Sequence, residues 1–209
     1  MPKTEPFEKY ALQYEDWFVK NKFAYQSELQ AIREQLPEEG WGIEIGVGSG
    51  QFAEPLHIKI GIEPSSKMRE IARQRGIETI DAIAENLPFD NSQFDFALMA
   101  TTICFLDNIE AAFREAYRVL KPDGRLIIGF IDKGSSIGKL YQQRKSKSEF
   151  YKIATFYSVR EVISQLKKVG FRDFNFRQTI FHNLTKITDI EPIKKGYGEG
   201  SFVVVRVIK

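Results

Sequence analysis

Three glycines stand at alternate positions directly after a short apolar run. In the stretch GIEIGVGSGQF, residues 42–52, they are Gly46, Gly48 and Gly50. Glycine in regular structure costs roughly 0.5–1 kcal/mol relative to alanine, so the pattern indicates a place where bare backbone is needed. Beyond the carboxyl end of a parallel strand, such a loop turns tightly, and the next helix start offers free N–H groups to an anionic group. The pattern predicts a ligand-binding loop.

The spacing of these glycines narrows the choice of ligand. No Gly-Lys-Ser/Thr follows them, as a P-loop requires, and Gln51 stands where a dinucleotide loop has its last glycine. Glu63 ends the next apolar stretch. A carboxylate at that place can accept hydrogen bonds from both hydroxyls of a ribose. The residues therefore favour a nucleoside that carries an amino acid. A purely structural glycine turn and a surface carboxylate are the alternatives.

Short apolar stretches alternate with helical ones in the rest of the chain. Five strands are expected, over residues 41–46, 57–63, 78–84, 94–100 and 124–131. Helices are expected between them, over residues 65–76 and 108–120, the second ending in a Pro-Asp-Gly turn. Such alternation predicts a doubly wound α/β fold with a parallel sheet and helices on both faces.

Both ends of the chain depart from this alternation. Residues 158–170 predict a helix with Ser158 as N-cap and Gly170 as C-cap, and two strands then follow with no helix between them. We expect these strands to pair antiparallel at a sheet edge. Residues 7–37 favour helix and end at Pro37. The long polar stretch 132–155 has the length of a lid.

Bulk properties exclude several classes of protein. The net charge of +2 over 209 residues does not favour nucleic acid or an anionic membrane. Cys104 is the only cysteine, so neither an internal disulfide nor a cysteine metal cluster is possible, and no metal site is expected. The chain shows no signal peptide and no apolar run of about 18 residues, which predicts a cytoplasmic protein without a membrane segment.

Four blocks of sequence resemble the class I S-adenosylmethionine-dependent methyltransferases of the small-molecule type. The blocks are EIGVGSG, GIEPSSKM, AENLPFDNSQFDFAL and REAYRVLKPDGRLIIG, in the family's order, over about residues 41–130. The resemblance implies S-adenosyl-L-methionine as cofactor and a Rossmann-like sheet of seven strands, ordered 3-2-1-4-5-7-6 with strand 7 antiparallel. It divides the chain into an N-terminal helical cap, residues 1–37, and a methyltransferase domain, residues 38–209.

The resemblance also implies roles for single residues. The glycine loop would lie under the methionine part of the cofactor, Glu44 would orient its ammonium, and Glu63 would hold the ribose hydroxyls. The family often has Asp where this chain has Ile83, which leaves packing on the adenine ring as the role of that position. The implied cofactor-binding residues are Glu44, Gly46, Gly48, Gly50, Glu63, Pro64, Ile83, Ala84, Glu85, Ala100 and Thr101.

The expected activity is methyl transfer to a small-molecule acceptor, mainly by proximity and orientation, because the cofactor carries the reactive group. No catalytic side chain is assigned, and the protein is expected to be a monomer or homodimer. A non-catalytic module that binds the cofactor or its demethylated product is the alternative, and a nucleotide-linked dehydrogenase is a weaker one. The candidate acceptor-binding residues, each of which also has a purely structural interpretation, are Tyr10, Tyr14, Trp17, Cys104 and His182.

Overall fold

The computed structural model describes residues 3–209. The strands are β1 (Gly42–Ile45), β2 (Ile60–Ile62), β3 (Glu78–Ile80), β4 (Phe94–Ala100), β5 (Leu120–Ile131), β6 (Arg172–Thr179), β7 (Lys194–Lys195) and β8 (Phe202–Ile208). The α-helices are α1 (Glu5–Lys9), α2 (Ala11–Lys20), α3 (Lys22–Arg33), α4 (Ser66–Gln74), α5 (Ile109–Val119), α6 (Ser136–Gln143) and α7 (Val159–Val169).

These strands form one sheet in the order β3-β2-β1-β4-β5-β8-β6-β7. Strands β1 to β5 pair in parallel, whereas β8 is antiparallel to both β5 and β6. The doubly wound fold and the antiparallel insertion of the last strand are thus confirmed. The expected count of seven strands is wrong by one, because Lys194 and Lys195 add a two-residue strand beyond β6.

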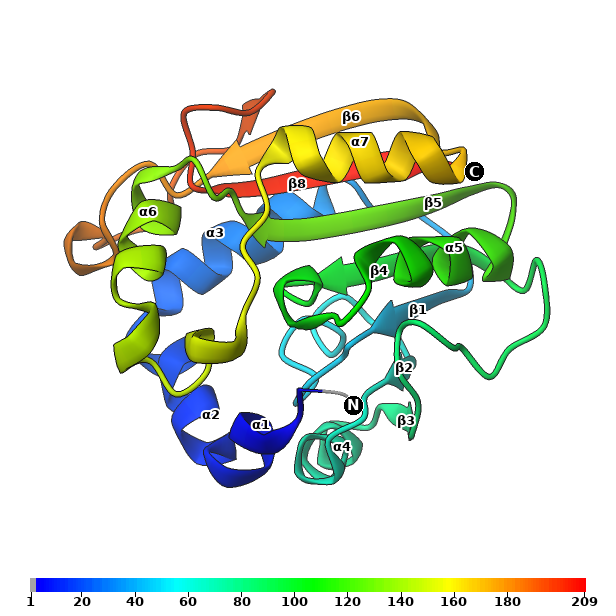
Figure 1. Cartoon of the computed structure of the whole chain (residues 1–209), viewed down its shortest axis with the longest axis horizontal. Coiled ribbons are helices and arrows are strands. Elements are labelled where there is room, and N and C mark those ends of the chain that lie inside the picture. The colour runs from blue at the N-terminus through cyan, green and yellow to red at the C-terminus, as the bar shows by residue number, and fades with distance from the viewer. Residues whose placement is uncertain (1–2) are drawn as a thin grey trace.

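Helices cover both faces of the sheet, with α5 and α7 on one face and α3 and α4 on the other (Figure 1). Strand β4 illustrates how both faces of the sheet are buried. Ala97 and Met99 pack with α5 and α7, whereas Phe96 and Leu98 pack with α3 and α4. Side chains of a strand alternate between faces, so a strand between two helical layers is apolar throughout.

Helix ends follow the expected capping chemistry. The Ser65 side chain accepts a hydrogen bond from the Met68 N–H at 3.2 Å, at the start of α4. Ser158 and Glu161 form a capping box at the start of α7, which ends at Gly170 with a φ of 112°. The capping residues therefore predicted the positions of these two helices correctly from the sequence alone.

Three segments differ from their predicted form. The N-terminal helical stretch is broken into α1, α2 and α3. Residues 120–123, expected to end a helix in a turn, belong to β5, because α5 already ends at Val119. The stretch 132–155 contains α6 and two 3₁₀ turns. In Figure 1 α1, α2 and α6 gather beyond the carboxyl ends of β4 and β5, where open sheets of this kind bind ligands.

Candidate functional site

The glycine loop follows β1 in a conformation that only glycine adopts readily. Gly46 and Gly48 have φ values of 75° and 54°. A Cβ on Gly46 would lie 2.3 Å from Cγ2 of Thr102, so the loop after β4 closes directly against the glycine loop. The hydroxyl of Thr102 also donates to the carbonyl of Gly46 at 3.2 Å. The two loops are thereby fixed relative to each other.

Glu63, just beyond β2, ties this loop to the start of α4. One carboxylate oxygen accepts the N–H of Gly48 at 3.0 Å, and the other accepts the N–H of Ser65 at 2.8 Å. Burial raises the pKa of Glu63 to about 7, against the lowering effect of these N–H groups and of Arg69. Each oxygen keeps further acceptor capacity, which a pair of hydroxyl donors can use.

A cavity of about 170 Å³ opens over these groups. It brings together most of the residues predicted to hold the cofactor: Gly46, Gly48, Glu63, Pro64, Ile83, Ala84, Glu85, Ala100 and Thr101. Glu44 and Gly50 lie outside this lining. A Cβ on Gly50 would lie 2.4 Å from Cδ1 of Ile77, so this glycine packs against the protein core. The contact of each of these residues with a cofactor stays a prediction.

Glu44 is buried beneath the loop, with 1% of its surface exposed. Its Oε2 atom has no hydrogen-bond partner among residues 3–209. Burial raises its pKa well above the usual range, with the Ala53 N–H acting in the opposite direction. A buried polar atom without a partner carries a desolvation cost, which a bound donor can relieve.

The wall at Ile83 and Glu85 is closed by the segment after β4. Glu85 accepts hydrogen bonds from the N–H groups of Asp107 and Asn108, at 2.9 and 3.1 Å. These bonds hold the Glu85 carboxylate at the N-terminus of α5, where its charge is favourable. This carboxylate therefore stabilises the fold as well as lining the cavity.

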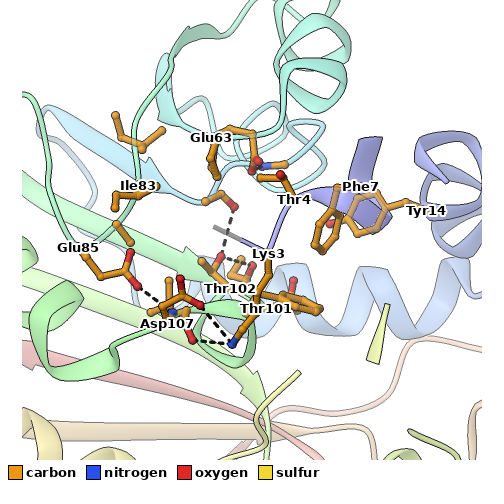
Figure 2. A pocket seen from close by; sticks show the side chains of 18 residues that line it. Lys3, Thr4, Phe7, Tyr14, Glu63, Ile83, Glu85, Thr101, Thr102 and Asp107 are labelled. Atoms are coloured by element: carbon orange, nitrogen blue, oxygen red, sulfur yellow. Dashed lines mark hydrogen bonds and ion pairs between the residues drawn. The ribbon is translucent and has the colours of Figure 1, made fainter. Parts of the chain in front are cut away.

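The sequence predicts that the N-terminal helical region covers the site, but it did not single out any of residues 3–9 as lining this cavity. Lys3, Thr4 and Phe7 line it (Figure 2). The Lys3 ammonium donates to the carbonyl of Leu106 at 3.0 Å. At the other end of this segment, the Glu8 carboxylate accepts a hydrogen bond from the Ser66 N–H at 2.6 Å, at the start of α4. We call residues 3–9 the strap, because they cross from one wall of the cavity to the other.

A second cavity, of about 270 Å³, adjoins the first. Of the candidate acceptor-binding residues, Tyr14, Trp17 and Cys104 line it. Tyr10 lies outside its lining. His182 also lies outside, with an exposed ring whose Nδ1 is 2.5 Å from a carboxylate oxygen of Glu191. The two cavities share four lining residues, which are Phe7, Tyr14, Thr101 and Phe105.

Two ionisable side chains near this shared wall, Tyr14 and Cys104, are neutral at ordinary pH. Burial, assisted by Glu44 and Glu63, raises the pKa of Tyr14 well above its usual value. Burial also raises the pKa of Cys104 to about 12, so it remains a thiol. Its Sγ lies 3.4 Å from the carbonyl of Thr101. Neither side chain supplies an anionic nucleophile.

Glu28, on α3, was also missed from the sequence. It lines the second cavity and is 4% exposed. Its place in the sequence carried a signal, because Ala24, Ala31 and Ile32 form the buried stripe of the same helix. An acid inside such a stripe breaks the amphipathic pattern.

Within residues 3–209, no helix is long and apolar enough to cross a membrane. Over the same residues, no group of three or more His, Cys, Asp or Glu side chains is arranged to hold a metal ion.

Comparison with known proteins places this architecture in a family. A family model described as a methyltransferase domain matches residues 43–128. An uncharacterised protein of Methanocaldococcus jannaschii is 47% identical over 203 residues, covering 97% of this chain and 98% of that protein. A ubiquinone/menaquinone biosynthesis C-methyltransferase of Campylobacter jejuni is 31% identical over 148 residues, covering 60% of this chain and 63% of that enzyme.

A crystal structure from Thermotoga maritima is similar over almost the whole length. It is 52% identical, covers 99% of each chain and superposes with a TM-score of 0.97. That protein is described as an S-adenosylmethionine-dependent methyltransferase and a possible histamine N-methyltransferase. With the glycine loop and the sheet order, these similarities show that the chain belongs to the class I S-adenosylmethionine-dependent methyltransferases, with S-adenosylmethionine as its cofactor.

Proposed function

We propose that this methyltransferase acts on a small-molecule acceptor, which binds in the second cavity while S-adenosylmethionine binds in the first. The observation that carries the proposal is the shared wall of the two cavities, where Phe7, Tyr14, Thr101 and Phe105 line both. Two adjoining cavities can hold two reactants with their reacting atoms in contact. The aromatic second cavity has the character of a small-molecule site.

The groups in and beneath the first cavity match the chemical groups of the cofactor. The glycine loop leaves its backbone bare, and Glu63 keeps acceptor capacity for ribose hydroxyls. The unpartnered Oε2 of Glu44 beneath the loop suits an ammonium group nearby. When bound, the cofactor supplies an electrophilic methyl group, whose bond to sulfur breaks as an electron pair of the acceptor bonds to its carbon.

The protein would contribute to methyl transfer by positioning the two reactants and by excluding water from them. Holding two reactants in line is worth on the order of 7–11 kcal/mol of the barrier. The strap covers the first cavity and Tyr14 faces both, so they would separate the reacting atoms from solvent. The neutral Tyr14 and Cys104 support a mechanism without a side-chain nucleophile.

An acceptor screen that detects S-adenosylhomocysteine tests this proposal. The panel should contain small amines, because a similar protein is described as a possible histamine N-methyltransferase, together with phenols, carboxylates and carbon acids. Turnover on one class of small molecule is the expected result. Turnover only on protein or nucleic acid would contradict the proposal, and tight cofactor binding without any turnover would favour the non-catalytic alternative.

A further inference from the structure

The second cavity is lined by one carboxyl group and by many aromatic side chains. Glu28 is the only charged side chain among the described residues that line it. Trp17, Phe18, Tyr141 and Tyr151 line the same space. Aromatic faces attract cations by about 0.5–2 kcal/mol, and more strongly when water is excluded. The lining therefore has the electrostatic character of a cation site.

Glu28 is held there without any partner in the protein. It is 4% exposed, and among residues 3–209 no hydrogen bond or ion pair satisfies its carboxyl group. Buried carboxyl groups are normally paired, because leaving one unpaired costs free energy. An unpaired acid that faces a cavity instead of a neighbouring side chain is placed to meet a ligand.

We propose that Glu28 binds a protonated nitrogen of the methyl acceptor, and that the acceptor is a small apolar molecule with a basic amine at one end. The proposal rests on the proposed transfer to a small molecule. Glu28 lines only the second cavity, whereas the wall next to the cofactor cavity is made by Phe7, Tyr14, Thr101 and Phe105. The nitrogen bound by Glu28 and the atom that receives the methyl group would therefore lie at opposite ends of the acceptor.

A change of protonation accompanies this binding. Burial raises the pKa of Glu28 to about 8, so the carboxyl is mostly neutral at pH 7 without a ligand. A bound ammonium favours the carboxylate, and Glu28 then releases its proton to solvent. Tyr141 and Tyr151 line the same cavity. Burial raises the pKa values of both tyrosines, so they do not contribute to the proton release.

Calorimetry on the full chain, saturated with S-adenosylhomocysteine at pH 7, tests the proposal. The probes are 2-phenylethylamine and tryptamine, with 2-phenylethanol as the neutral counterpart. We expect the amines to bind about 10- to 150-fold more tightly than the alcohol, which is the range for a hydrogen bond to a charged group. Titration in two buffers of different ionisation enthalpy should show release of about one proton per amine bound.

The variant Glu28→Gln keeps the shape of the side chain and removes its charge. It should lose the amine preference and the proton release while its affinity for S-adenosylhomocysteine stays unchanged. Glu39→Gln, at an exposed position outside both cavities, is the matched control and should behave as the wild type.

Equal binding of amine and alcohol to the wild type would overturn the proposal, as would no amine binding or full amine affinity in Glu28→Gln. Because the complex with S-adenosylhomocysteine needs no turnover, failure of amine binding is distinct from failure of methyl transfer in the acceptor screen.

Discussion

Replacement of Glu28 by glutamine should change how the stability of the protein depends on pH. The carboxyl has a pKa of about 8 in the folded chain because burial disfavours its charge, and 4.5 is its ordinary value. Folding therefore takes up a proton between these two pH values. The free energy of unfolding of the wild type must then fall as the pH rises from about 4.5 towards 8, and a glutamine removes this loss.

The size of the effect follows from the two pKa values. Within this window, each pH unit lowers the stability of the wild type relative to Glu28→Gln by up to about 1.36 kcal/mol. Between pH 5 and pH 7 the relative loss should be on the order of 2–3 kcal/mol. Glu44 and Glu63 also have raised pKa values, but they are present in both proteins, so the difference isolates Glu28.

Urea unfolding of both proteins at pH 5 and pH 7 measures this difference directly. Glu39→Gln provides the control for loss of one acidic charge at an exposed position. If the stability of Glu28→Gln runs parallel to that of the wild type between these pH values, the Glu28 carboxyl has an ordinary pKa. The argument for an unpaired acid in the second cavity would then be refuted.

Four further outcomes are expected. Glu63→Ala should weaken binding of S-adenosylmethionine by about 10- to 150-fold in calorimetry without unfolding the chain, and the wild type should bind this cofactor more tightly than NAD. Gly46→Ala should abolish cofactor binding or lower the melting temperature, because its Cβ would collide with the Thr102 side chain at 2.3 Å; a fully active variant would contradict the loop geometry. The pair Lys3→Ala and Glu8→Gln should speed cofactor dissociation in stopped flow without changing the far-UV spectrum, and an unchanged rate would show that the strap does not cover the ligand.

Local chemistry predicted much of the scaffold. Strand β4 was placed at its observed bounds, Phe94–Ala100, because a strand buried on both faces is apolar throughout. Ser158 and Gly170 marked α7 correctly through capping, which depends on neighbouring residues only. Strand β7 was missed because two lysines carry no apolar pattern, and they form a strand only through pairing with β6.

The part of the candidate site that is formed by the loops following the strands could be predicted from the sequence. Glu63 and the glycine loop are brought together by the parallel register of β1 and β2, which the sequence pattern already implied. A cover from the N-terminal region was expected, but the residues that anchor the strap were not predictable, since Lys3 and Glu8 bond to residues far along the chain. Glu28 gave a signal, an acid within a buried stripe, but only the packing around α3 shows that a cavity faces it.

The position of the strap has a consequence for the order in which ligands come and go. Phe7 belongs to the strap and lines both cavities. With the cofactor and the acceptor bound as we propose, a movement of the strap that frees one ligand would also loosen the enclosure of the other, so we expect their residence times to be coupled. In a chain built this way, we expect the demethylated cofactor to leave slowly while the methylated product is still bound, so that product release limits turnover.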